Sequence, residues 1–344
     1  MTIDPAQRVP LGRTGLEVTR LGFGGASIGG LFEDIADEAA IETARHAWDL
    51  GVRLFDTAPL YGYGAAERRL GVALADRPRD AFVLSTKVGR LVRDAAAIPA
   101  GADIDRQALE GVDDAFYVRR DPGKIVFDYS GDGVRRSLEE SLERLHLERV
   151  DIALIHDPDD HWQVAIDEAW PSLEQLRAEG VIRAVGAGMN QSAMLARFVR
   201  ETDMDVVLVA GRYSLLDQGA LDDLLPACLD RGVAVLVGGV MNSGVLADPR
   251  PGARFNYVPA SPEIIDRARR IGAICDRHAV PLRAAAMQFP MAHPSVASLV
   301  SGVRSIAHLD EYSDLLRYPI APDLWTELRE GGLIDERAPL PSAP

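Results

Sequence analysis

The chain has 344 residues, of which 47% are hydrophobic and 26% charged, with a formal net charge of −15. This composition is typical of a folded globular protein, and its acidity argues against partners with a phosphate backbone, which need a basic face. The N-terminus has no signal-peptide pattern, and no apolar run is long enough to cross a bilayer. We therefore expect a cytoplasmic protein without a nucleic-acid or membrane partner, and the composition does not predict its oligomeric state.

The first element predicted along the chain is a hairpin. Gly12 and Gly15 lie in the sequence LGRTGL, and glycine at these positions allows a tight turn between two short apolar ends. We expect this hairpin to cap a larger structure.

From residue 20 onward, eight apolar runs alternate with amphipathic segments. Their hydrophobic character is nearly continuous, which is typical of parallel strands that are covered on both faces. The runs are RLGFG, VRLFD, FVLSTK, VDIALIH, VIRAVGAG, DVVLVAG, VAVLVGG and VASLVSG.

The segments between these runs have helical patterns. Asp37 is a candidate N-cap for a helix that Gly51 ends, and Asp132 is a candidate N-cap for another. Eight strands alternating with eight helices favour a closed parallel (β/α)8 barrel, or TIM barrel, and no linker divides residues 1–344 into more than one domain. Further helices are predicted shortly after Tyr61 and at about 165–179, 190–200, 219–230, 262–278 and 307–316.

The longest irregular stretch runs from Val88 to Asp128, directly after the third predicted strand. In a barrel it would lie over the mouth, and we interpret it as a flap on the substrate side. Its basic residues, Arg119, Arg120 and Lys124, form either a solvated surface or a contact for a substrate or cofactor phosphate. The Pro-rich tail that ends in ERAPLPSAP is expected to have little structure of its own.

Other patterns carry weaker functional signals. HDPDDH gathers histidines and carboxylates, but no second cluster has metal-ligand spacing, so no metal is predicted. GFGGAS lacks the final glycine of a dinucleotide fingerprint, and we expect it to contribute to the barrel mouth, with Ser27 as a candidate contact. Cys228 and Cys275 lie far apart in helical patterns and are interpreted as buried, inert thiols. Trp162 is a candidate either for the pocket wall or for the core.

Four side chains at or just after strand ends carry the strongest functional prediction: Asp56, Tyr61, Lys87 and His156. In a TIM barrel these strand ends meet at one mouth, where active sites form. A tyrosine is a weak acid and base at neutral pH, so it needs a neighbouring ammonium such as Lys87, held by Asp56, to favour its ionised form. His156 can donate a hydrogen bond to the same substrate oxygen. Such a proton relay calls for a hydride partner that no side chain supplies, which predicts a nicotinamide cofactor.

The same residues lie in motifs that resemble the aldo-keto reductase family. The likeness covers nearly the whole chain, from LGRTGLEVTRLGFGG through FDTAPLYGYGAAERRLG, STKVGR and SLEESLERLHLERVDIALIHDPD to VIRAVGAGMNQ and GVRS. It implies that Asp56, Tyr61, Lys87 and His156 form a catalytic tetrad, with Tyr61 as general acid and base. DYSGDGVRRSLEESLERL, LVAGRYSLLDQ and GGVMNSGVLA are similar to the sugar dehydrogenase branch of the family. This likeness implies oxidation of the anomeric carbon of an aldose, of the L-fucose, D-threo-aldose or L-galactose type, to a lactone.

The resemblance also implies a set of cofactor contacts. Met189 and Asn190 match the pair that binds the carboxamide, although many members have serine in place of Met189, and Tyr213 matches the aromatic residue that stacks on the nicotinamide ring. Arg304 can pair with the 2′-phosphate of NADP, which would favour that cofactor. Two carboxylates lie nearby in the sequence, so the choice between NAD and NADP stays open. The contacts implied along the pyrophosphate and the adenosine phosphate are Asn242, Ser243, Gly244, Leu246, Ser301, Gly302, Val303 and Arg304.

Two alternatives to a sugar dehydrogenase stay open. Oxidation of pyridoxal or reduction of a small aldehyde would use the same four side chains. A non-catalytic role as a cofactor-sensing binding module would use the same fold, because fold does not determine function.

Overall fold

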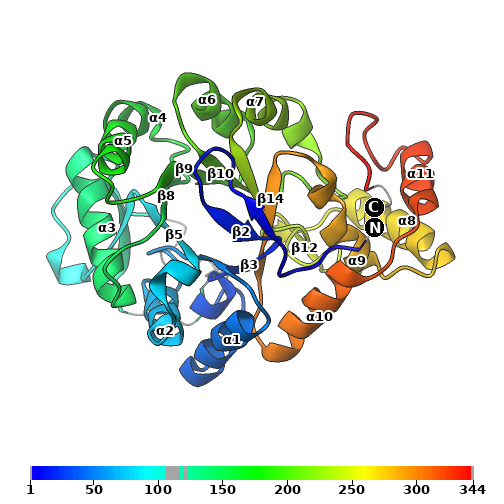
Figure 1. The fold of residues 1–344 in the computed structure, drawn as a ribbon, viewed down its shortest axis with the longest axis horizontal. Coiled ribbons are helices and arrows are strands. Elements are labelled where there is room, and N and C mark those ends of the chain that lie inside the picture. The colour runs from blue at the N-terminus through cyan, green and yellow to red at the C-terminus, as the bar shows by residue number, and fades with distance from the viewer. Residues whose placement is uncertain (1, 106–116, 119–121, 342–344) are drawn as a thin grey trace.

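The computed structural model describes residues 2–105, 117–118 and 122–341. At its centre eight parallel strands form a closed barrel (Figure 1). These strands coincide with the eight apolar runs, so the predicted TIM barrel is confirmed. In chain order they are β3 (Leu21–Gly24), β4 (Leu54–Asp56), β5 (Val83–Val88), β8 (Ile152–His156), β9 (Ala184–Met189), β10 (Val206–Ala210), β11 (Ala234–Gly238) and β14 (Val296–Gly302).

Helices surround the barrel and cover the outer faces of its strands (Figure 1). The helix predicted at 262–278 is present as α8 (Pro262–Arg277), but it lies outside the ring, against α11 (Pro322–Glu330). The position in the ring next to α10 is occupied by α9. Sequence analysis missed α9 because its sequence, LRAAAMQ, is short and mostly buried and has no amphipathic period. The ring helices are α1 (Asp37–Asp49), α2 (Ala65–Leu74), α3 (Gly131–Leu145), α5 (Trp170–Ala178), α6 (Ala193–Glu201), α7 (Leu224–Arg231), α9 (Leu282–Gln288) and α10 (Ile306–Arg317).

Both predicted helix caps are wrong. α1 begins at Asp37 itself, so the carboxylate lies in the first turn, where it pairs with Arg69. α3 begins after Ser130, whose hydroxyl accepts a hydrogen bond from the backbone N–H of Gly133, and Asp132 lies inside the first turn. The two aspartates still favour these helix starts, because the N-terminal end of the helix dipole attracts negative charge.

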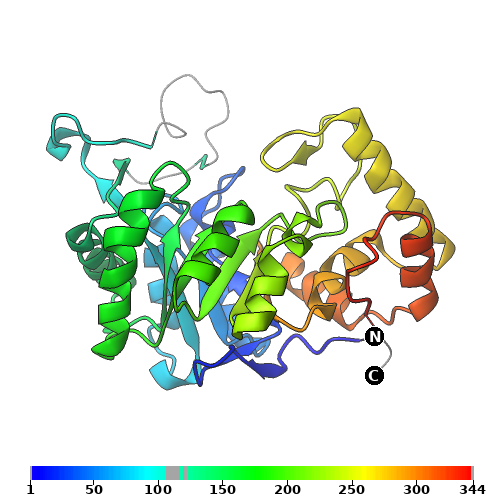
Figure 2. The ribbon, with the colours of Figure 1, turned by 90° about the horizontal axis from the view of Figure 1, so that it is seen from above.

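The N-terminal hairpin closes one end of the barrel (Figure 2). β1 (Arg8–Pro10) pairs antiparallel with β2 (Glu17–Thr19). The side chains of Leu11, Leu16 and Val18 pack against the first residues of the barrel strands. The prediction that the hairpin is a cap is therefore correct, and the cap lies at the end of the barrel opposite to the active-site mouth.

Part of the stretch that was predicted to be irregular is a two-stranded ribbon. β6 (Arg90–Arg93) pairs antiparallel with β7 (Lys124–Phe127), and the ribbon rises at the mouth of the barrel (Figure 2). The irregular-loop prediction is thus wrong for these two segments, which are too short to show a strand pattern in sequence. Of the predicted basic residues, Lys124 begins β7, and Arg119 and Arg120 lie outside the described residues.

Several smaller predictions can be compared with the structure. Cys228 and Cys275 are buried as free thiols, and burial raises the pKa of both to about 12, in agreement with an inert role. The tail has no helix or strand at residues 331–341, but it is held in place because Gln218 donates to the carbonyl oxygen of Leu333. Within the described ranges, no helix has the length and apolar character to span a membrane. The cytoplasmic location and the single-domain organisation stay predictions.

A glycine at the contact between α2 and α3 provides a test of this packing. A Cβ atom at Gly71 would overlap the carbonyl oxygen of Leu145, so we expect Gly71→Ala to force the helices apart and to lower the free energy of unfolding by about 1–3 kcal/mol. The control is Gly272→Ala in α8, where the nearest atom lies 3.6 Å from the new Cβ. This control should be neutral or stabilising by up to about 1 kcal/mol. Urea unfolding measures both changes, and equal stabilities would contradict the close contact.

Candidate active site

The four predicted catalytic residues meet at the mouth of the barrel. Asp56 ends β4, Lys87 is the second-last residue of β5, and His156 ends β8. Tyr61 lies in the turn between β4 and α2. Because neighbouring parallel strands end at the same level, their last side chains converge on one site.

A buried ion pair forms the base of this site. Lys87 Nζ donates to Asp56 Oδ2 at 2.7 Å and to the carbonyl oxygen of Thr57 at 2.9 Å, and both charged side chains are almost completely buried. Burial raises the pKa of Asp56, and the Lys87 ammonium opposes that rise. Each charge requires the other, because an unpaired charge at this depth would lose its hydration without compensation.

The ring of Tyr61 lies beside this pair. Lys87 Nζ is 4.6 Å from the ring centre, and the His156 ring meets the tyrosine ring edge-on at 5.8 Å between centres. Burial raises the pKa of Tyr61 well above its ordinary value, and the negative charge of Asp56 adds to the rise. Lys87 lies beside the phenol, but its charge is balanced by Asp56, and the removal of the phenol from water is the larger effect on the pKa of Tyr61.

His156 faces the phenol as a neutral imidazole. Burial lowers its pKa well below the ordinary value, and the positive charges of Arg90 and Lys87 lower it further. Its backbone is held from behind, because the Tyr129 hydroxyl donates to the carbonyl oxygens of His156 and Asp157 at 2.5 and 3.0 Å. Nδ1 is buried and has no hydrogen-bond partner among the described residues, so Nε2 is the nitrogen left to face a substrate.

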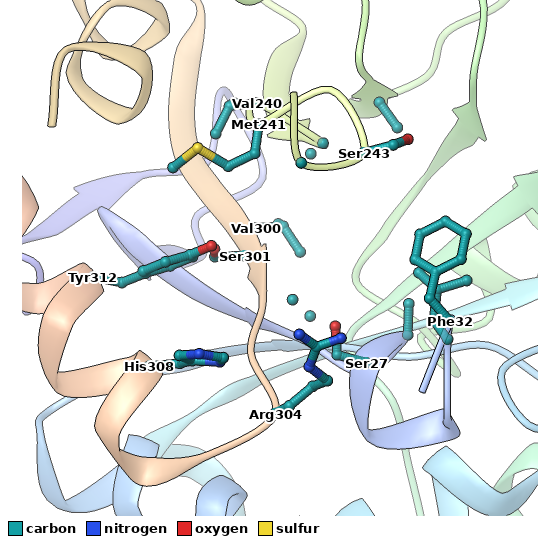
Figure 3. Close-up of a pocket in the computed structure, with 18 of the residues that line it drawn as sticks. Ser27, Phe32, Val240, Met241, Ser243, Val300, Ser301, Arg304, His308 and Tyr312 are labelled. Atoms are coloured by element: carbon teal, nitrogen blue, oxygen red, sulfur yellow. The ribbon is translucent and has the colours of Figure 1, made fainter. Parts of the chain in front are cut away.

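A cavity of about 420 Å³ is lined by Asp56 and Tyr61 and by the last residues of β11 and β14. Figure 3 shows part of its lining, including Ser301 and Arg304. Its size falls in the range of small-molecule sites. The predicted cofactor contacts that line it are Ser243, Gly244, Ser301, Gly302 and Arg304, together with the candidate Ser27. Asn190 and Asn242 line a smaller hollow that shares several residues with this cavity.

The side chains of four predicted cofactor contacts lie in the core instead: Met189, Tyr213, Leu246 and Val303. Tyr213 is fully buried and packs against Phe289, with 5.3 Å between ring centres, and its predicted contact with the nicotinamide ring stays a prediction. Gly238 and Gly239, at the end of β11, give the cavity wall an exposed backbone surface.

Sequence analysis missed two aromatic residues that line the cavity near its opening. Phe32 follows β3, and Tyr257 lies in the turn between β12 (Arg254–Phe255) and β13 (Val258–Pro259). Their ring centres are 5.9 Å apart. Both residues have positive φ angles, 64° and 71°, which are rare for bulky side chains and are a structural signal of function. No periodic pattern in the sequence marks either residue.

The motif HDPDDH begins at the last residue of β8. Within the part of the chain that the structure describes, no group of three His, Cys, Asp or Glu side chains is placed to hold a metal ion. His161 Nε2 lies 2.8 Å from Asp103 Oδ2. Trp162 packs against Phe198 with 4.5 Å between ring centres, so of its two predicted roles the structure supports packing.

This fold is shared with known proteins. Residues 20–331 match the model of the aldo/keto reductase family. D-threo-aldose 1-dehydrogenase from a Pseudomonas species is 43% identical over 324 residues, which cover 93% of this chain and 96% of that protein. Pyridoxal 4-dehydrogenase from Microbacterium luteolum is 40% identical over 345 residues, which cover 97% of this chain and 100% of that protein. The chain belongs to the aldo/keto reductase family.

A solved structure agrees with this assignment. The holo form of an aldo-keto reductase from Bacillus halodurans superimposes with a TM-score of 0.71 and 25% sequence identity, and the match covers 94% of this chain and 95% of that one. The protein is therefore an oxidoreductase that uses a nicotinamide cofactor, as the sequence predicted.

The cavity fits such a cofactor. Its lining includes both the phenol of Tyr61 and the cationic side chain of Arg304, which suits a molecule that carries a reactive ring and phosphates. A Cβ at Gly302 would lie 2.6 Å from Ser27 Oγ, so a larger residue there would displace this hydroxyl.

The ion pair beside Tyr61 generates a prediction about stability. Lys87→Met leaves the Asp56 carboxylate buried without its partner, so we expect the free energy of unfolding to fall by about 3–5 kcal/mol. Adding Asp56→Asn removes the second charge and should recover most of that loss. Urea unfolding of the two single variants and the double variant measures the coupling. A double variant that loses the sum of the two single effects would show that the charges do not depend on each other.

Proposed function

We propose that the protein is an NAD(P)-dependent aldose 1-dehydrogenase, which oxidises the anomeric carbon of a free sugar to a lactone. The observation that carries the proposal is the convergence of Tyr61, His156 and the Lys87–Asp56 pair at the inner end of the cofactor cavity. The 43% identity to D-threo-aldose 1-dehydrogenase supports an aldose of the D-threo type, and L-fucose and L-galactose are the further candidates from the sequence motifs.

Each side chain of the site has a distinct proposed role. Tyr61 is the general acid and base: its phenolate oxygen takes the proton of the C1 hydroxyl during oxidation, and its phenol returns that proton during reduction. Lys87, held by Asp56, places a positive charge 4.6 Å from the ring centre, which stabilises the phenolate as it forms. Neutral His156 donates a hydrogen bond that orients the same substrate oxygen. The nicotinamide, when bound, accepts hydride from C1.

The proposed cofactor contacts follow the cavity from this end outward. Asn190 binds the carboxamide, Ser243 and Gly244 lie along the pyrophosphate, and Ser301 and Arg304 lie beside the adenosine. Tyr213, which is buried in the core, stays a candidate for the nicotinamide ring from its motif alone.

NAD is the preferred cofactor in this proposal. The two arginines at the outer end of the cavity already have carboxylate partners: Arg304 Nη1 lies 3.0 Å from Glu33 Oε1, and Arg283 Nη1 donates to Glu311 Oε2 at 2.7 Å. A 2′-phosphate would have to displace one of these carboxylates from its arginine. Titration of the protein with each dinucleotide decides between the two cofactors.

Pyridoxal is the second candidate substrate. The chain is 40% identical to a pyridoxal 4-dehydrogenase over the full length of that protein. The same tyrosine would act on its aldehyde or hemiacetal oxygen, so the two reactions differ in the substrate and share the proton relay.

A substrate panel tests the proposal, with turnover followed by the absorbance of the reduced cofactor. We expect oxidation of threo-configured aldoses, and we expect Tyr61→Phe to lower kcat by about 100- to 10,000-fold with cofactor affinity unchanged, because only the proton transfer is lost. Tyr318→Phe is the control, since that hydroxyl donates to Ala279 outside the cavity. Oxidation of pyridoxal but of no aldose would favour the second candidate. Tight cofactor binding with no turnover would favour a binding module.

The raised pKa of Tyr61 predicts that oxidation and reduction differ in their pH dependence. Below this pKa the phenolate fraction grows about tenfold per pH unit, so kcat/KM for aldose oxidation should rise with pH between about pH 7 and pH 9. Reduction of a small aldehyde uses the phenol, which stays populated in this range, and should not rise. His156 is neutral throughout, so it adds no step near its ordinary pKa. An oxidation profile that is flat over this range would remove Tyr61 as the base.

A further inference from the structure

Arg90 is a buried cation without a role in the mechanism above. It is the first residue of β6, and one residue separates it from the end of β5. Only 6% of its surface is exposed. Nη1 donates to Asp105 Oδ2 at 2.7 Å, and Nη2 donates to Asp157 Oδ2 at 3.2 Å. The guanidinium carbon lies 5.1 Å from the centre of the Phe127 ring. Because contacts on both sides restrict this planar guanidinium, it also restricts the positions of the Asp105 and Asp157 carboxylates.

Asp157 connects this cation to two residues of the site. Oδ2, which accepts from Arg90, lies 3.6 Å from His156 Nε2, and Oδ1 accepts from the backbone N–H of Asn190 at 3.2 Å. Asp157 has a φ of 41°, a conformation that L residues rarely adopt, and its backbone N–H donates to the carbonyl oxygen of Gly188 at 3.0 Å. Such strain persists only where the surroundings hold the residue in place.

Through Asp105, the hydrogen bonds of Arg90 also reach residues 103–105. The backbone N–H of Asp105 donates to the carbonyl oxygen of Ile125 in β7, and that of Phe127 donates to Asp103, so residues 103–105 run along the ribbon. His161, in the loop after β8, contacts Asp103. Arg90 therefore stands where the ribbon and the loop carrying Asp157 meet.

We propose that Arg90 is a positioning residue: through Asp157 it fixes the imidazole of His156 and the backbone of Asn190, so that both are aligned together with the substrate oxygen. The inference rests on the proposed roles of His156 and Asn190, and it does not depend on which sugar is oxidised.

The geometry explains how this pair acts. A carboxylate near Nε2 favours the neutral tautomer with hydrogen on that nitrogen, which is the form that can donate to a substrate. Without the guanidinium, the Asp157 side chain loses the group that fixes its orientation, and the ring of His156 loses a fixed neighbour. A misplacement of about 1 Å at a reacting centre can cost about 100-fold in rate.

The kinetic test compares three variants on a substrate that the wild type turns over. Arg90→Met should lower kcat by about 100-fold, with a smaller change in KM. Arg90→Lys should recover part of the loss, because an ammonium can reach one carboxylate but cannot span two. Arg93→Met is the matched control: Arg93 lies on the same strand but pairs with Glu140, away from the site, and its loss should change kcat by less than about twofold. Equal effects of Arg90→Met and Arg93→Met would overturn the proposal.

A second measurement needs no turnover. The seven histidines are labelled with ¹⁵N, and the signals of His156 are identified by their loss in His156→Gln. We expect the Nε2–H tautomer in the wild type and a mixture of tautomers in Arg90→Met and in Asp157→Asn. If Arg90→Met does not fold, Arg90→Lys and Asp157→Asn, which nearly preserve side-chain volume, carry the test. Unchanged His156 signals in these variants would overturn the positioning role. A protein that oxidises no sugar would contradict the proposed function and leave this measurement valid.

Discussion

The buried ion pair between Lys87 and Asp56 is the constraint on which the rest of the site depends. Two charges at this depth are tolerated because Nζ and Oδ2 are 2.7 Å apart, and that distance requires β4 and β5 to end side by side. The closed barrel meets this requirement, with its floor sealed by the N-terminal hairpin. Tyr61 then lies beside a cation whose charge is already balanced, which explains why burial dominates its pKa.

The cofactor cavity and the substrate side of the mouth are built in different ways. The cavity runs over backbone at Gly238, Gly239 and Gly302, so a long ligand can approach the barrel closely. On the proposed substrate side, ion pairs hold the structure together. Arg90, the first residue of β6, pairs with Asp105 and with Asp157, which is next to His156. The reacting centre thus lies between a cavity wall of glycines and a ribbon anchored by a buried ion-pair network.

Sequence patterns predicted the features that repeat along the chain and missed those that depend on a single contact. The eight strands were recognised because strands covered on both faces are continuously apolar. α9 was missed because seven mostly buried residues show no period, and α8 took its place in the prediction. The contact of Tyr213 with Phe289 is of the second kind, because nothing in the motif indicates which way a side chain turns after the strand ends.

The sequence by itself determined the barrel, the family and the four residues at the strand ends, because all of these follow from order and spacing along the chain. Only the tertiary structure decided the pairing of Arg90 with Asp157, the contact of Phe32 with Tyr257 and the burial that raises the pKa of Tyr61. These properties depend on burial and on distances between atoms of segments far apart in the chain, and the strength of an electrostatic interaction is set by separation and access to water.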